Sequence, residues 1–155
     1  MKPKKNDAIQ NTGTCHPCCL THRLRRAFAK GTGESPAGRR GIAFYQKHDY
    51  AQALPYFEQA QQAGHMKAPR YLGLMYLNGE GVAKNAQTAF AYFTQAAAAG
   101  DITGQYWLGY CYENGIGTAK DMTQAVRWYQ KSAARGDHVS QPAIDALKRL
   151  GVKTN

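Results

Sequence analysis

Residues 72–81 read Leu-Gly-Leu-Met-Tyr-Leu-Asn-Gly-Glu-Gly, and residues 108–117 read Leu-Gly-Tyr-Cys-Tyr-Glu-Asn-Gly-Ile-Gly. Around these stretches, the windows 68–103 and 104–139 align without a gap and share 13 of 36 residues. Where an aromatic residue changes, as between Phe93 and Tyr129, another ring replaces it and so preserves the volume that a core needs. The chain therefore contains a tandem internal repeat, and the rest of the sequence is interpreted around it.

Each copy of the repeat predicts two helices joined by a glycine-rich loop. The predicted hairpins cover residues 68–100 and 104–136, and Asn85 and Asp121 are suited to cap the second helix of each. Gly73 lies inside a predicted helix, where glycine costs about 1 kcal/mol relative to alanine. We expect a close approach of the partner helix to compensate for that cost.

Two further elements flank the tandem copies. Residues 37–64 repeat the helix spacings with a shorter connection, which predicts a hairpin with a tight turn at His48 and Asp49. Residues 140–150 carry apolar side chains on one face and are followed by Gly151. They predict a helix that caps the open end of the array.

The pattern at 68–139 resembles the Sel-one-like repeat (SLR) family, a branch of the tetratricopeptide-like superfamily. Hairpin 37–64 looks like an ordinary tetratricopeptide unit. The resemblance implies an all-α fold, a right-handed α-solenoid of stacked antiparallel helix hairpins with a C-terminal capping helix. It also implies a role as a scaffold in bacterial protein complexes, in signalling, envelope or secretion settings, and the resemblance names no partner.

Family geometry places the partner in a concave groove lined by the first helix of each hairpin. Side chains of that helix that the packing motif leaves free are the candidates for contact with a peptide or a partner helix. On this register the predicted groove residues are Ile42, Tyr45, Arg70, Leu74, Leu77, Tyr106, Tyr110 and Glu113. Some of them are equally suited to pack against the neighbouring hairpin.

The charge of the chain is concentrated at its N-terminal end. The net charge is +10, and residues 1–40 alone contribute +7. We interpret residues 1–36 as a basic, cysteine-containing flexible tail with a short amphipathic helix, and residues 37–151 as the solenoid. Because no nucleic-acid module is recognisable, the basic tail does not predict specific nucleic-acid binding.

Cysteine and histidine residues cluster in that tail. Cys15, Cys18, Cys19 and His22 are of the ligand types that zinc prefers. All four lie within eight residues and no second pair follows at finger-like spacing, so incidental thiols are the favoured interpretation and no cofactor is predicted. A metal or redox role of this cluster stays open as an alternative.

Enzymatic activity is the other alternative. A cysteine-rich branch of the resembled family is described as binding penicillins and hydrolysing β-lactams. This chain has only Cys111 in its repeats and lacks both a Ser-x-x-Lys motif and a Lys-Thr-Gly triplet. We therefore expect a non-catalytic interaction module.

The hydropathy of the chain bears on its location and its partners. No apolar run is long enough to span a bilayer. The basic first residues are not followed by the apolar segment that a signal peptide needs, so a cytoplasmic protein is expected. A periplasmic or secreted protein is the alternative if the start codon is wrong. Three hairpins are close to the minimum for a stable array, so association of the chain with itself or with a partner is plausible.

Overall fold

A computed structural model describes residues 35–153 of the chain, and these residues all belong to one compact unit. Their regular secondary structure is entirely helical. The helices are α2 (Pro36–Gln46), α3 (Tyr50–Gln62), α4 (Ala68–Asn78), α5 (Ala86–Ala98), α6 (Ile102–Asn114), α7 (Met122–Ala133) and α8 (Gln141–Arg149). The predicted tail, including Cys15, Cys18, Cys19 and His22, lies outside the described residues.

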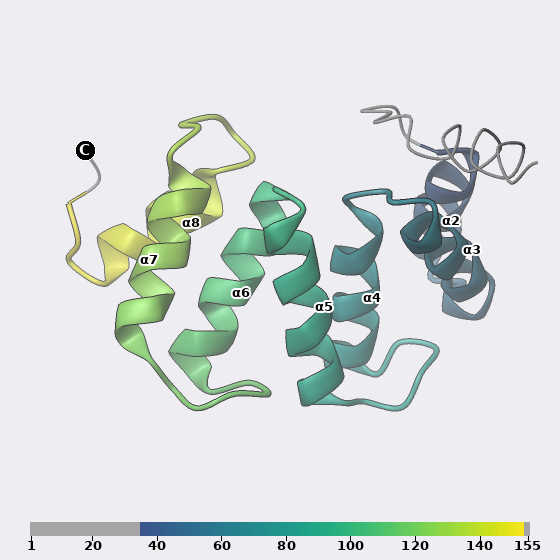
Figure 1. Ribbon diagram of the computed structural model, residues 1–155, viewed down its shortest axis with the longest axis horizontal. Coiled ribbons are helices and arrows are strands. Elements are labelled where there is room, and N and C mark those ends of the chain that lie inside the picture. Colours follow the sequence, from purple (N-terminus) through teal and green to yellow (C-terminus); the bar gives the residue numbers. More distant parts are fainter. Residues whose placement is uncertain (1–34, 154–155) are drawn as a thin grey trace, which may run out of the picture. The chain divides into compact units, whose positions relative to one another are not determined.

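Each helix packs against the next one along the chain, from α2 on α3 through to α7 on α8. Figure 1 shows the resulting succession of hairpins, with α2 and α8 at opposite ends of the described unit. The all-α solenoid of helical hairpins predicted from the repeat is confirmed. Its right-handed superhelical sense stays a prediction.

The glycine inside the first helix of each hairpin lies directly against a large ring on the second helix. A Cβ atom added to Gly73 would lie 2.6 Å from Phe93 Cε1, and one added to Gly109 would lie 2.9 Å from a Tyr129 ring carbon. Both rings are fully buried. The two helices of a hairpin approach this closely because glycine has no side chain, which is the compensation expected for its low helix propensity.

Five of the seven described helices begin at a short polar side chain that caps the N-terminus, and α4 and α8 are the two that lack such a cap. Asn85 and Asp121 accept hydrogen bonds from the backbone N–H groups three residues later, as predicted, and Asp49 does the same at the start of α3. Asp101 caps α6 in the same way through the N–H of Gly104 at 2.9 Å. This last cap was not predicted from the sequence, and because of it the third hairpin begins at Ile102 rather than at residue 104.

The connections inside the hairpins differ as the sequence predicts. Gly79 and Gly115, which end α4 and α6, take left-handed backbone angles with φ of 76° and 70°. The connection between α2 and α3 is shorter, and His48 adopts φ of 59° there. The tight turn at His48 and Asp49 is thereby confirmed.

The predicted capping helix is also present. Helix α8 packs against α7 and buries Ala143, Ala146 and Leu147 in a cluster with Ala125 and Tyr129. It covers the apolar side of α7 that would otherwise face solvent at the end of the array.

Candidate protein-binding face

The eight side chains predicted to line a groove all come from the first helices of the three hairpins. We call them the helix-A set: Ile42 and Tyr45 on α2, Arg70, Leu74 and Leu77 on α4, and Tyr106, Tyr110 and Glu113 on α6. All except Glu113 are half-buried. A half-buried apolar or aromatic side chain still presents part of its surface to a partner, and its contacts within the chain decide how much.

The aromatic members on α6 form one group with a tryptophan. The ring of Tyr106 lies 6.5 Å from that of Tyr110 and 5.6 Å from that of Trp107, and Trp107 and Tyr110 pack edge to face at 5.4 Å. Ring pairs at these distances hold each other in a fixed orientation. Helix α6 thus carries a preformed aromatic surface.

Trp107 was missed in the sequence analysis, although the repeat contains a signal for it. Its ring stacks on Phe93 of the preceding hairpin at 5.7 Å. The equivalent residue one repeat earlier, Tyr71, stacks on Phe57 at 4.8 Å. An aromatic residue shared by the two copies at this place therefore marks the contact between successive hairpins.

Tyr45 ties the first hairpin to the second. Its hydroxyl donates a hydrogen bond to Glu80 Oε2 at 2.9 Å, and its ring lies 5.2 Å from that of Tyr71. Burial, and then the bond to the Glu80 carboxylate, raise the pKa of Tyr45 well above its usual value. The hydroxyl therefore stays protonated as a donor, and one edge of the ring is already engaged within the chain.

Arg70 is engaged in an ion pair within the chain. Its Nη1 lies 3.3 Å from Oδ1 of Asp101, with only 13% and 7% of the two side chains exposed. Burial raises the pKa of the Asp101 carboxyl, and the Arg70 guanidinium opposes that rise. Arg70 thus fixes the second hairpin to the start of α6, a role that sequence reasoning did not assign to it.

Glu113 differs most from its expected position. It is only 8% exposed, and its carboxylate accepts a hydrogen bond from the Tyr129 hydroxyl at 2.7 Å. Arg149 of α8 contacts both oxygens, at 2.7 and 2.9 Å. These donors, Arg149 first, hold the pKa of Glu113 below its usual value. Glu113 therefore anchors the capping helix, because its position at the end of α6 brings it beside both α7 and α8.

The charges of the helix-A set are consequently balanced inside the fold. Arg70 has Asp101, and Glu113 has Arg149. The members on α4 and α6 that form no ion pair are apolar or aromatic and half-buried: Leu74, Leu77, Tyr106 and Tyr110.

The metal alternative concerns Cys15, Cys18, Cys19 and His22, which lie outside the described residues. Within residues 35–153, no three His, Cys, Asp or Glu side chains are grouped as metal ligands would be. Cys111 is buried, and burial raises the pKa of its thiol to about 12, far from the value of an activated nucleophile.

Comparison with protein families settles the family. The model of the Sel1 repeat matches residues 26–65, 68–101 and 102–137. This chain belongs to the Sel1 repeat family. The first match corrects the interpretation of hairpin 37–64 as an ordinary tetratricopeptide unit: it is a Sel1 repeat with a shortened connection between its helices.

Solved structures of Sel1 repeat proteins have the same fold. A Sel1 repeat protein from Oxalobacter formigenes is 32% identical over 74% of this chain and 48% of its own, with a TM-score of 0.64. The protective antigen c5321 of uropathogenic Escherichia coli, which has an SLR fold, is 26% identical over 79% and 28%, also with a TM-score of 0.64. The Sel1 repeat chain described here thus spans about half the length of the first and less than a third of the second.

A third similar structure shows the fold alone. Helicobacter pylori cysteine rich protein B is 22% identical, with 70% of this chain and 97% of its own aligned and a TM-score of 0.54. No curated protein is similar enough in sequence to count as a match.

Sel1 repeat proteins are in general non-catalytic scaffolds that mediate protein interactions. No helix within residues 35–153 is long and apolar enough to cross a membrane.

Proposed function

We propose that this Sel1 repeat protein is a non-catalytic adaptor that binds a peptide or a partner helix on the face formed by the first helices of its hairpins. The observation that carries the proposal is the aromatic group on α6, in which Tyr106, Trp107 and Tyr110 are half-buried and hold one another in place. Tyrosine and tryptophan surfaces of this kind are enriched where proteins bind one another.

Charge balance defines the class of partner. Since Arg70 and Glu113 are paired within the chain, the face has no free charge at these positions to attract an oppositely charged ligand. Leu74 and Leu77 extend the aromatic surface with aliphatic side chains packed on the neighbouring core. A partner segment with an apolar face fits this surface better than a highly charged one.

The test is a comparison of bound proteins captured from the source lysate by matched variants. Tyr110→Ala and the double variant Tyr106→Ala/Tyr110→Ala remove the aromatic surface. Tyr56→Ala is the control. Tyr56 is also half-buried and stacks on Phe44 at 5.5 Å, but it belongs to α3, the second helix of its hairpin, and so is not part of the proposed face. Circular dichroism establishes that each variant is folded.

We expect a specific set of partners to bind the wild type and the Tyr56→Ala protein but not the α6 variants. A version beginning at Gly33 separates the contribution of the tail and keeps Ser35, which caps α2. Partners that bind all the tyrosine variants and disappear with the tail would contradict the proposal.

A further inference from the structure

Helix α8 is more than a cover, because it repeats the geometry of the first helix of a hairpin. At an offset of 36 residues, Cys111 and Ile116 correspond to Leu147 and Val152. The N–H of Ile116 donates to the carbonyl of Cys111 at 2.9 Å, and the N–H of Val152 donates to that of Leu147 at 2.9 Å. Gly151 adopts φ of 70°, as Gly115 does. Residues 141–152 thus form the first half of a fourth repeat.

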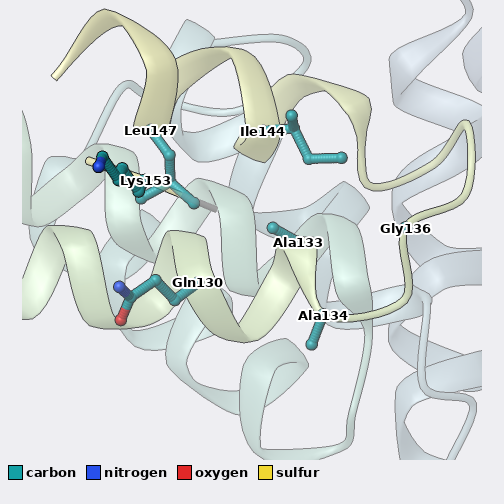
Figure 2. Close-up of a pocket in the computed structure, with 7 residues that line it drawn as sticks. All are labelled: Gln130, Ala133, Ala134, Gly136, Ile144, Leu147 and Lys153. Atoms are coloured by element: carbon teal, nitrogen blue, oxygen red, sulfur yellow. The ribbon is translucent and has the colours of Figure 1, made fainter. Parts of the chain in front are cut away.

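The surface that the second half of such a repeat would cover is partly open. In the preceding repeat Ala97 and Leu108 are each 1% exposed, whereas their equivalents Ala133 and Ile144 are half-buried. Figure 2 shows the resulting hollow between α7 and α8, lined by both of these side chains. Its volume is about 400 Å³.

The outer side of α7 continues this open surface. On α5, the equivalent helix one repeat earlier, this side is covered by the loop between α6 and α7. A Cβ added to Gly117 of that loop would lie 2.8 Å from Phe90 Cβ. The residues of α7 at the same places, Met122 and Val126, line a second, shallower hollow, and Met122 is 38% exposed. We call the two hollows together the end surface. By the repeat register, one loop and one helix would pack on this surface.

The chemistry of the end surface differs from that between interior helices. Inside the array, a glycine of the first helix faces a ring, as Gly73 faces Phe93, and one turn later Tyr76 stacks on Tyr92 at 5.6 Å. On α8 these two places are taken by Asp145 and Lys148. A ring in the usual position would meet the Asp145 side chain, so a helix with the ordinary repeat sequence does not fit.

Asp145 and Lys148 carry exposed charges, and within α8 Asp145 Oδ1 also accepts a hydrogen bond from Gln141 Nε2 at 2.8 Å. Their side chains are 60% and 65% exposed, and Lys148 Nζ lies 4.0 Å from Asp145 Oδ1. An exposed pair at that separation contributes little to stability, so both charges are easily redirected to a partner. By the repeat register, a residue at the place of Trp128 would face Lys148, and the residue at the place of Tyr129 would face Asp145.

We propose that the end surface binds an amphipathic helix of a partner protein that carries an acidic residue followed directly by a basic residue where α7 carries Trp128 and Tyr129. Small residues at the places of Ala125, Ser132 and Ala133 complete its apolar stripe. Apolar contact with Ile144 and Ala133 provides binding, and the two charge pairs provide the choice of partner. This surface is separate from the helix-A set.

The experiment uses two synthetic peptides with the α7 sequence, residues 122–136. One carries Trp128→Glu and Tyr129→Arg, and the other carries the same two residues in reverse order, so that composition and net charge are identical. Each peptide bears a fluorescent label, and its binding to the full chain is measured by fluorescence anisotropy. We expect the acid-then-base peptide to bind about tenfold more tightly than the reversed one.

The Asp145→Lys/Lys148→Asp protein is the matched control, because it exchanges two exposed charges and keeps the net charge. It should invert the preference between the peptides, whereas Tyr110→Ala should leave it unchanged. Equal binding of both peptides to the wild type, or no binding of either at millimolar concentration, would overturn the proposal. So would sedimentation showing that the protein associates with itself through Asp145 and Lys148, because the occupant would then be a second copy.

Discussion

Replacing Gly73 with alanine sets two well-known effects against each other. Alanine is the better helix former by about 1 kcal/mol, so propensity alone predicts stabilisation. The added Cβ would lie 2.6 and 2.8 Å from two ring carbons of Phe93, whereas carbon atoms in contact are normally about 3.5–4.0 Å apart. The ring would have to move by about 1 Å.

Other core side chains enclose the Phe93 ring and limit how far it can move. Phe93 is fully buried, and its ring is stacked on Trp107 at 5.7 Å. Overpacking of a core of this kind typically costs about 1–3 kcal/mol, and contacts this short place the cost in the upper half of that range. After the gain in propensity, we expect Gly73→Ala to lower the free energy of unfolding by about 1 kcal/mol or slightly more.

Urea denaturation followed by circular dichroism measures this change, with two controls. Ala91→Gly, at an exposed position of α5, measures the propensity effect in the same protein and should cost about 1 kcal/mol. In a Phe93→Leu background, which lacks the outer ring carbons, the penalty for Gly73→Ala should vanish or change sign. The packing argument fails if Gly73→Ala stabilises the wild type, or if its penalty persists in the Phe93→Leu background.

Three other outcomes are expected. Phe93→Ala and Tyr129→Ala should each cost about 3 kcal/mol in urea denaturation, and Tyr110→Ala far less, because only the first two rings are fully buried; equal losses for all three would contradict the position assigned to Tyr110. Because the pKa of Glu113 lies below its ordinary 4.5 in the folded chain, its contribution to stability is complete above that pH and is lost as the pH falls through the folded value. Denaturation between about pH 3 and 6 should therefore show a shallower acid loss for Glu113→Gln than for the wild type, and parallel curves would argue against the anchor. Cys111, whose thiol has a pKa of about 12, should resist iodoacetamide at about pH 8 until urea unfolds the chain, as mapped by mass spectrometry.

The sequence by itself determined the architecture. Helix hairpins, their glycine-rich connections and the caps at Asn85 and Asp121 follow from local rules that apply within a few residues. The close approach at Gly73 also follows, because a glycine repeated inside a helix has few other physical reasons. The repeat strengthens the prediction, since each copy independently indicates the same two helices and the same loop.

Only the tertiary structure decided which side chains are free. Arg70 and Glu113 have the helical register of groove residues, yet their charges are neutralised by Asp101 and Arg149, which lie 31 and 36 positions further along the chain. Helical periodicity gives the direction of a side chain but does not specify which residue of another hairpin lies beside it. The chemistry of a solenoid's surface depends on contacts between successive hairpins and with the capping helix. The fold could therefore be predicted from the sequence, whereas the ion pairs that engage Arg70 and Glu113 within the chain could not.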